Sequence, residues 1–231
     1  MSTANTIGID PTALFAIRDL ELRARVVVEG LWSGLHRSPL EGFSVEFTEY
    51  RNYSPGDDLR YLDWKVLGRT DQEFIKKFED ETNLRCMILV DTSRSMKFTS
   101  GETSKAEYAR TLAATLSYFL LQQRDVVGLG LIDRDLHQFL PARWRPGQFK
   151  RLLSLLSLES EGKETNLGNG LDQIGKLTPK RSLIIVISDF LSLPAEWEKS
   201  MGQLIAAGHD VRAIQILDSA ELDLEFGKAS Q

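Results

Sequence analysis

Short apolar runs alternate with helical patterns along the second half of this chain. Each apolar run is bounded by turn residues, which is typical of strands buried on both faces of a parallel sheet. Between these runs, apolar residues recur at helical spacing. Strands are predicted at 87–90, 126–132, 136–140, 182–187 and 210–217, and helices at 105–123, 149–158, 168–177 and 195–207. This alternation predicts an α/β fold with a doubly wound, mostly parallel sheet.

The first third of the chain carries weaker patterns. Apolar residues recur at helical spacing between Pro11 and Leu31, which predicts a single N-terminal helix. From 34 to 82 the chain is aromatic, charged and rich in turn residues, with strand patterns at 44–50 and 74–78. This segment is too polar to form a second core. We therefore interpret it as a β-rich extension that packs on the main domain.

The composition is that of a globular protein with a sizeable core. Of the 231 residues, 42% are hydrophobic and 26% are charged, and the net charge of −5 implies no broad phosphate-binding surface. The single cysteine, Cys86, precludes an internal disulfide and suits a reducing compartment. No apolar run approaches the roughly 20 residues that span a bilayer, and the N-terminus lacks a signal-peptide pattern. We expect a cytoplasmic protein without a membrane span.

Oxygen-bearing side chains stand where a ligand is expected in such a fold. Asp91, Ser93 and Ser95 follow the first buried strand, and loops at the carboxyl ends of strands form the binding crevice of open α/β sheets. Thr165, in a polar loop, and Asp189, after a later strand, could complete a metal shell. Hard cations such as Mg²⁺ prefer oxygen ligands of this kind. The sequence therefore predicts a metal site formed by these five residues.

The motifs on this chain resemble two related protein families. Asp91-x-Ser93-x-Ser95, a later threonine loop and a later strand-end aspartate are similar to the metal-ion-dependent adhesion site of von Willebrand factor A domains. The segments 34–39, 42–47, 50–65 and 69–70 strongly resemble domain-of-unknown-function family 58, whose likeness runs from about residue 34 to about residue 218. Proteins of that family are von Willebrand A-like and are often encoded beside MoxR-type AAA+ ATPases.

The resemblance implies a role for each candidate ligand. Asp91 would bind the ion through its carboxylate, directly or through water, and Ser93 and Ser95 would supply hydroxyl oxygens. Thr165 and Asp189 would alternate between direct and water-mediated contact, and a protein partner would donate a Glu or Asp to the ion. The implied metal is Mg²⁺ or Mn²⁺, between which the ligands do not discriminate. The implied partner is a MoxR-type AAA+ ATPase or its client protein, with this chain acting as a non-catalytic co-chaperone or adaptor.

The predicted organisation has four parts. Residues 1–33 form an N-terminal tail and helix, and 34–82 form the family-specific extension. Residues 83–220 form the von Willebrand A-like domain with its metal-ion-dependent adhesion site, and 221–231 form a polar tail. The sequence does not specify an oligomeric state.

Several other interpretations fit parts of the same sequence. Aspartate, serine and threonine at strand ends often only cap turns and helix starts, so a metal-free structural or assembly protein is one alternative. A Mg²⁺-dependent hydrolase with Asp91 as nucleophile is another, although Ser93 stands where the common phosphatase pattern has a second aspartate. Basic and aromatic residues interleave between 50 and 77, as in nucleic-acid sites, but acidic residues lie among them. We expect mutual salt bridges there and no nucleic-acid partner.

Overall fold

The computed structural model describes the ranges 10–36, 49–52, 74–77, 84–158, 166–192 and 194–222, together with Gly68. The chain divides into two compact units. One unit is Leu35–Thr82, and the other joins Met1–Gly34 to Asn83–Gln231. Each unit is described by itself, and the candidate site lies in the larger one.

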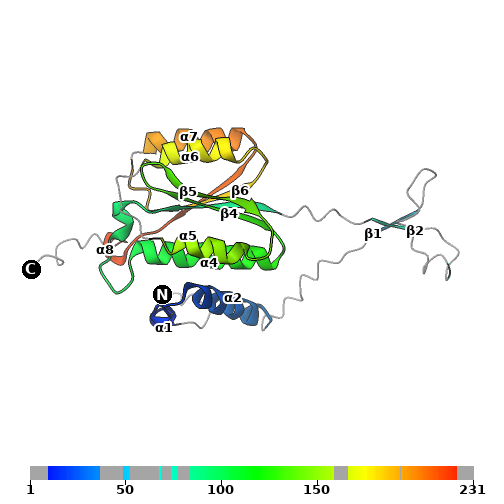
Figure 1. Ribbon diagram of the computed structural model, residues 1–231, viewed down its shortest axis with the longest axis horizontal. Coiled ribbons are helices and arrows are strands. Elements are labelled where there is room, and N and C mark those ends of the chain that lie inside the picture. Colours follow the sequence, from blue (N-terminus) through cyan, green and yellow to red (C-terminus); the bar gives the residue numbers. More distant parts are fainter. Residues whose placement is uncertain are drawn as a thin grey trace, which may run out of the picture. The chain divides into compact units, whose positions relative to one another are not determined.

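A five-stranded sheet forms the centre of the larger unit (Figure 1). Its strands are β3 (Arg85–Asp91), β4 (Val126–Ile132), β5 (Leu136–Arg143), β6 (Leu183–Ser188) and β7 (Asp210–Gln215). They lie in the order β5-β4-β3-β6-β7. All neighbours pair in parallel except β5, which runs antiparallel to β4 at one edge. The predicted edge strand at 136–140 is thus present and continues to Arg143.

Helices cover both faces of this sheet (Figure 1). On one face lie α4 (Lys105–Gln122) and α5 (Gln148–Leu156), and on the other lie α6 (Leu167–Leu177) and α7 (Pro194–Ala206). All four were predicted, with small shifts at their ends. The predicted fold class, a doubly wound and mostly parallel sheet, is confirmed.

The central strands are apolar at nearly every position because both of their faces are covered. Along β3, Ile88 and Val90 belong to the core on the α4 side, whereas Met87 and Leu89 belong to the core on the α6 side. In β4, a Cβ added to Gly128 would lie 2.6 Å from the backbone nitrogen of Ala142 on β5. This position therefore needs glycine, because a side chain would meet the backbone of the neighbouring strand.

The predicted single N-terminal helix is wrong. The chain instead forms α1 (Pro11–Ala16) and α2 (Leu20–His36), and Ile17 between them has extended backbone angles. The break has a local cause, because the side chain of Asp19 accepts a hydrogen bond of 2.9 Å from the backbone N–H of Leu22. This contact gives α2 a start of its own.

The smaller unit contributes one described pair of strands. β1 (Glu49–Asn52) pairs antiparallel with β2 (Phe74–Lys77), and β2 confirms the strand pattern at 74–78. Most of the strand predicted at 44–50 lies outside the described residues. The packing of segment 34–82 on the main domain stays a prediction.

Two short helices were not predicted. The 3₁₀ helix η2 (Arg94–Lys97) follows β3, and α8 (Ser219–Leu222) follows β7. The second of these runs across position 220, where the main domain was predicted to end. Among the residues that the structure describes, no helix is long and apolar enough to cross a membrane.

Candidate metal centre

The carboxyl end of β3 brings three predicted ligands together. Asp91 is the last residue of the strand, Ser93 directly precedes η2, and Ser95 lies within η2. Asp91 and Ser93 are almost fully buried, at 2% and 1% exposure. The backbone N–H of Ser93 donates to Asp91 Oδ1 at 2.8 Å, so the turn itself fixes the carboxylate.

Asp91 also contacts the neighbouring strand. The hydroxyl of Ser188, at the end of β6, donates to Asp91 Oδ2 at 2.5 Å. Burial raises the pKa of the Asp91 carboxyl and outweighs the hydrogen bonds from Ser188 and Ser93, which lower it; the charge of Asp189 raises it further. An adjacent cation would favour the ionised carboxylate.

The two serine hydroxyls contact each other, and that of Ser93 does not cap η2. Ser93 occupies the cap position of η2 but makes no side-chain capping hydrogen bond. Its Oγ instead lies 3.1 Å from Oγ of Ser95. Mg²⁺ holds its octahedral ligands at about 2.1 Å, which places neighbouring oxygens about 3 Å apart. The spacing of these hydroxyls therefore suits two adjacent ligands of one ion.

Asp189 lies at the same edge of the sheet but is already paired. It follows β6, the parallel neighbour of β3, and is 1% exposed. Its Oδ2 accepts a hydrogen bond from Nζ of Lys105 at 2.9 Å, and its Oδ1 accepts one from the backbone N–H of Leu191 at 3.2 Å. A metal ion that binds this carboxylate would compete with these two hydrogen bonds.

Lys105 places a buried positive charge beside the predicted ligands. The side chain is 2% exposed and also forms an ion pair of 2.7 Å with Glu221 on α8. Burial lowers the pKa of the Lys105 ammonium, but the hydrogen bonds and charges of Glu221 and Asp189 together outweigh it and raise the pKa above its ordinary value. Lys105 is therefore positively charged at this site.

The turn after Asp189 has an unusual backbone. Phe190 has a φ of 55°, in the left-handed region that a bulky residue rarely adopts. Its N–H donates to Oγ of Ser188 at 3.0 Å. Its ring packs edge-on against Trp197, with the ring centroids 5.2 Å apart. Strained backbone of this kind concentrates at functional sites. The next residue, Leu191, is 62% exposed beside the site.

Thr165, the fifth predicted ligand, lies outside the described residues. Its neighbour Asn166 begins the described part of that loop, and its N–H donates to the backbone oxygen of Asp133, just beyond β4, at 2.9 Å. Asn166 also provides the side-chain cap of α6, by accepting from Asn169 N–H at 3.0 Å. The helix-cap role considered for Thr165 thus belongs to Asn166.

Sequence reasoning missed Ser188, Lys105 and Glu221. Ser188 had a recognisable signal, since it directly precedes Asp189 at a strand end. Lys105 had a subtler one, because it is the first residue of α4, where the helix dipole disfavours a cation. A lysine at that position predicts a nearby carboxylate. Glu221 carried no signal, since it stands 116 residues from Lys105.

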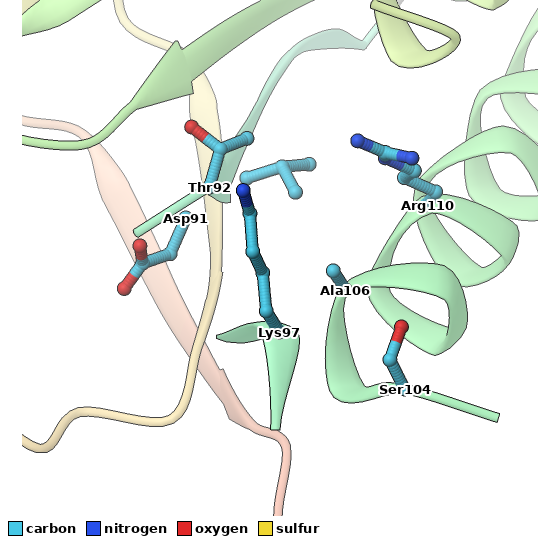
Figure 2. A pocket seen from close by; sticks show the side chains of 7 residues that line it. Asp91, Thr92, Lys97, Ser104, Ala106 and Arg110 are labelled. Carbon is cyan, nitrogen blue, oxygen red and sulfur yellow. The ribbon is translucent and has the colours of Figure 1, made fainter. Parts of the chain in front are cut away.

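A cavity of about 250 Å³ opens beside Asp91 on the α4 side (Figure 2). Figure 2 shows Lys97, from η2, and Arg110, from α4, reaching toward it, whereas the Asp91 carboxylate is turned away from both cations. The lining is completed by Val90, Thr92, Ser104 and Ala106. The space therefore presents positive charge near the candidate metal ligands.

Comparison with solved structures gives distant likenesses. An aerotolerance-related membrane protein from Bacteroides fragilis NCTC 9343 aligns with a TM-score of 0.49 at 20% identity, over 58% of this chain and 67% of that one. A structure described as the SpRpn10 VWA domain aligns with a TM-score of 0.37 at 17% identity, over 62% of this chain and 93% of that one.

Sequence comparison gives nearer relatives. Uncharacterized protein Rv1480 of Mycobacterium tuberculosis (strain ATCC 25618 / H37Rv) is 29% identical over 218 residues, which are 93% of this chain and 68% of the relative. The family model described as "Protein of unknown function DUF58" matches residues 49–230. The match covers both strands of the smaller unit and all the described site residues. The chain belongs to the DUF58 family.

Proposed function

We propose that this protein is a non-catalytic interaction module that binds Mg²⁺ or Mn²⁺ and, through the ion, an acidic group of a protein partner. The observation that carries the proposal is the 3.1 Å spacing of the Ser93 and Ser95 hydroxyls beside the Asp91 carboxylate. In this proposal these three residues hold the ion. Thr165 and Asp189 bind it directly or through water.

The surroundings of the site favour an acidic partner. Lys97 and Arg110 line the adjoining cavity, and among the described residues neither of them forms an ion pair. In this proposal a Glu or Asp side chain of the partner that entered the cavity would meet these cations, which would strengthen the binding of the partner. The exposed side chain of Leu191 offers an apolar contact at the rim. Through the family resemblance, we propose a MoxR-type AAA+ ATPase or its client protein as the partner, with this chain as co-chaperone or adaptor.

A metal-free structural or assembly role is the second candidate, and one observation favours it. The ammonium of Lys105 already neutralises Asp189, so part of the charge that a metal would balance is balanced by the chain itself. In that case the hydroxyls of Ser93 and Ser95 would only stabilise the turn. Thermal unfolding with added divalent metal distinguishes the two candidates.

The test is thermal unfolding of the wild type and Asp91→Asn across Mg²⁺, Mn²⁺ and Ca²⁺ titrations. An ion that binds only the folded state adds about 1.4 kcal/mol at tenfold over its Kd, which raises the midpoint by a few degrees. We expect this rise in the wild type with Mg²⁺ and Mn²⁺ and its loss in Asp91→Asn. Asp172→Asn, which changes an exposed aspartate on α6, should retain it. Equal responses in the wild type and Asp91→Asn would overturn the metal site.

Binding to the partner is tested next. The purified chain is mixed with the MoxR-type ATPase of the same cell, with Mg²⁺ or with a chelator. We expect association that the chelator and Ser93→Ala both weaken at least tenfold. Association that neither the chelator nor Ser93→Ala weakens would favour the metal-free candidate.

A further inference from the structure

The strongest observation that the proposed function does not explain is the position of Lys105. Its side chain is 2% exposed, and its Nζ lies 2.9 Å from Asp189 Oδ2 and 2.7 Å from Glu221 Oε1. It stands at the first position of α4, where the helix dipole opposes a cation. The two carboxylates compensate for that placement, together with the ring of Phe98, whose centroid lies 5.8 Å from Nζ. One of the carboxylates belongs to the candidate metal site, and the other lies outside it on α8.

Each oxygen of Asp189 already accepts one hydrogen bond while Lys105 is in place. Its Oδ1 receives the N–H of Leu191, and its Oδ2 receives the lysine ammonium. A divalent ion in contact with this carboxylate would be close to the ammonium and would repel it, since both are cations in a buried setting. Direct metal binding by Asp189 is therefore disfavoured while Lys105 keeps this position.

Glu221 offers the ammonium a second partner. Its carboxylate is itself held in place, because its Oε2 accepts the backbone N–H of Asp218 at 2.8 Å. Asp218 in turn accepts hydrogen bonds from both the N–H and the hydroxyl of Ser100. Lys105 can thus give up Asp189 and keep one buried ion pair with α8.

We propose that Lys105 is a built-in competitor of the divalent ion for Asp189, and that Glu221 retains the ammonium when the ion takes Asp189. The inference rests on the proposed function, because it concerns the same metal site. With Lys105 on Asp189, an incoming ion has only Asp91 as an anionic ligand. With Lys105 on Glu221, the ion has two carboxylates and binds more tightly.

Isothermal titration calorimetry with Mn²⁺ on the wild type and four variants of this chain tests the competition. Lys105→Gln should bind at least tenfold more tightly than the wild type, because Asp189 is no longer paired. Glu221→Gln should bind about threefold more weakly, because the displaced ammonium loses its second partner. The double variant should match Lys105→Gln, since in this proposal Glu221 changes the affinity for the ion only through Lys105. The control is Lys176→Gln, which removes one exposed charge on α6 and should change the affinity less than threefold.

The outcomes separate this inference from the proposed function. Binding that Asp91→Asn abolishes but Lys105→Gln leaves unchanged or weakens would overturn the competition and leave the metal site intact. Binding in Lys105→Gln but not in the wild type would support the competition and mean that lysine replaces the ion in the resting protein. Absence of saturable binding in every variant would overturn both.

A second measurement needs no variant and applies even if Lys105→Gln does not fold. Lysine acylation followed by mass spectrometry reads the reactivity of each lysine in the wild type. Lys105 should react at least threefold faster in saturating Mg²⁺ than without metal, because the ion leaves it with one carboxylate partner in place of two. The exposed Lys97 should react equally fast in both conditions. Unchanged protection of Lys105 at metal saturation would overturn the inference.

Discussion

At the scale of single residues, two helical glycines have opposite roles. Gly170, in α6, packs against the end of β4, where an added Cβ would lie 2.5 Å from Cγ2 of Ile132. Gly202, in α7, has no atom within 4 Å of an added Cβ. We predict that Gly170→Ala lowers the free energy of unfolding by about 1–3 kcal/mol through overpacking. Gly202→Ala should raise it by up to about 1 kcal/mol through helix propensity.

Urea unfolding of both variants checks this prediction, and each serves as the control for the other. The substitution is the same and both sites are helical, so a shared propensity effect cancels in the comparison. If Gly170→Ala gained as much stability as Gly202→Ala, the close contact between α6 and β4 would be wrong.

The site residues show what a sequence can predict at this scale. Asp91, Ser93 and Asp189 were recognisable because a strand pattern ends directly before each ligand segment. Lys105 was not recognised as their neighbour, because its place at the start of α4 indicates a nearby carboxylate but does not identify Asp189, which stands 84 residues away. The candidate residues could therefore be selected from spacing, whereas the charge balance around them depended on tertiary packing.

At the scale of elements, one buried arginine attaches the N-terminal helices to α4. Arg23 on α2 is 4% exposed, donates to Oγ1 of Thr111 at 2.8 Å and forms an ion pair with Glu107 at 3.0 Å. It also donates to the backbone oxygen of Ile17 in the link between α1 and α2. We predict that Arg23→Ala lowers the free energy of unfolding by about 2–4 kcal/mol, since it removes a donor from the buried Thr111 hydroxyl and from the partly buried oxygen of Ile17.

Arg25 is the matched control for this prediction. It lies on the same helix, pairs with Glu21 at the surface and stacks over Tyr118 at 5.6 Å. Exposed contacts of these kinds contribute little, so Arg25→Ala should cost at most about 1 kcal/mol. Equal midpoints for the two variants in chemical denaturation would mean that α2 does not depend on the buried contacts of Arg23.

The elements that the sequence failed to predict share a physical cause. Ile17 ends α1 and Asp19 starts α2 through a single capping contact, which the hydrophobic spacing does not record. Helices η2 and α8 are one turn long, too short for any periodicity to emerge. Elements with long apolar patterns, such as α4 and β4, were predicted almost to their ends.

At the scale of the whole molecule, alternating strands and helices were enough to predict the fold class. The order of the strands was not available from the pattern, because β3 lies between β4 and β6 through crossovers that bring distant segments together. That order places Asp91 beside Ser188 and Asp189 and thereby creates the candidate site. The site is thus a product of topology more than of the local motif.

The free energy of unfolding in acid depends on carboxylates whose pKa values are shifted in opposite directions by folding. Burial raises the pKa of Asp91 and Asp125, so these groups oppose folding more as pH rises through their titration. Asp218 behaves in the other direction, because hydrogen bonds from the hydroxyl and N–H of Ser100 lower its pKa. Its contribution to stability is present above its unfolded pKa of about 3.9 and is lost as pH falls through the lower folded value.

We predict that Asp218→Asn is less stable than the wild type at pH 7 and that the difference narrows below about pH 4. Urea midpoints measured at intervals from pH 7 to pH 3 check this. Asp210→Asn is the control, because Asp210 is exposed and pairs only with the exposed Arg212 among the described residues, so its difference from the wild type should stay small. A constant difference for Asp218→Asn at every pH would mean that the shape of the side chain, and not its charge, anchors α8 to the loop at Ser100. The C-terminal helix would then be held independently of the ionisation of Asp218, and acid would weaken this protein through other carboxylates.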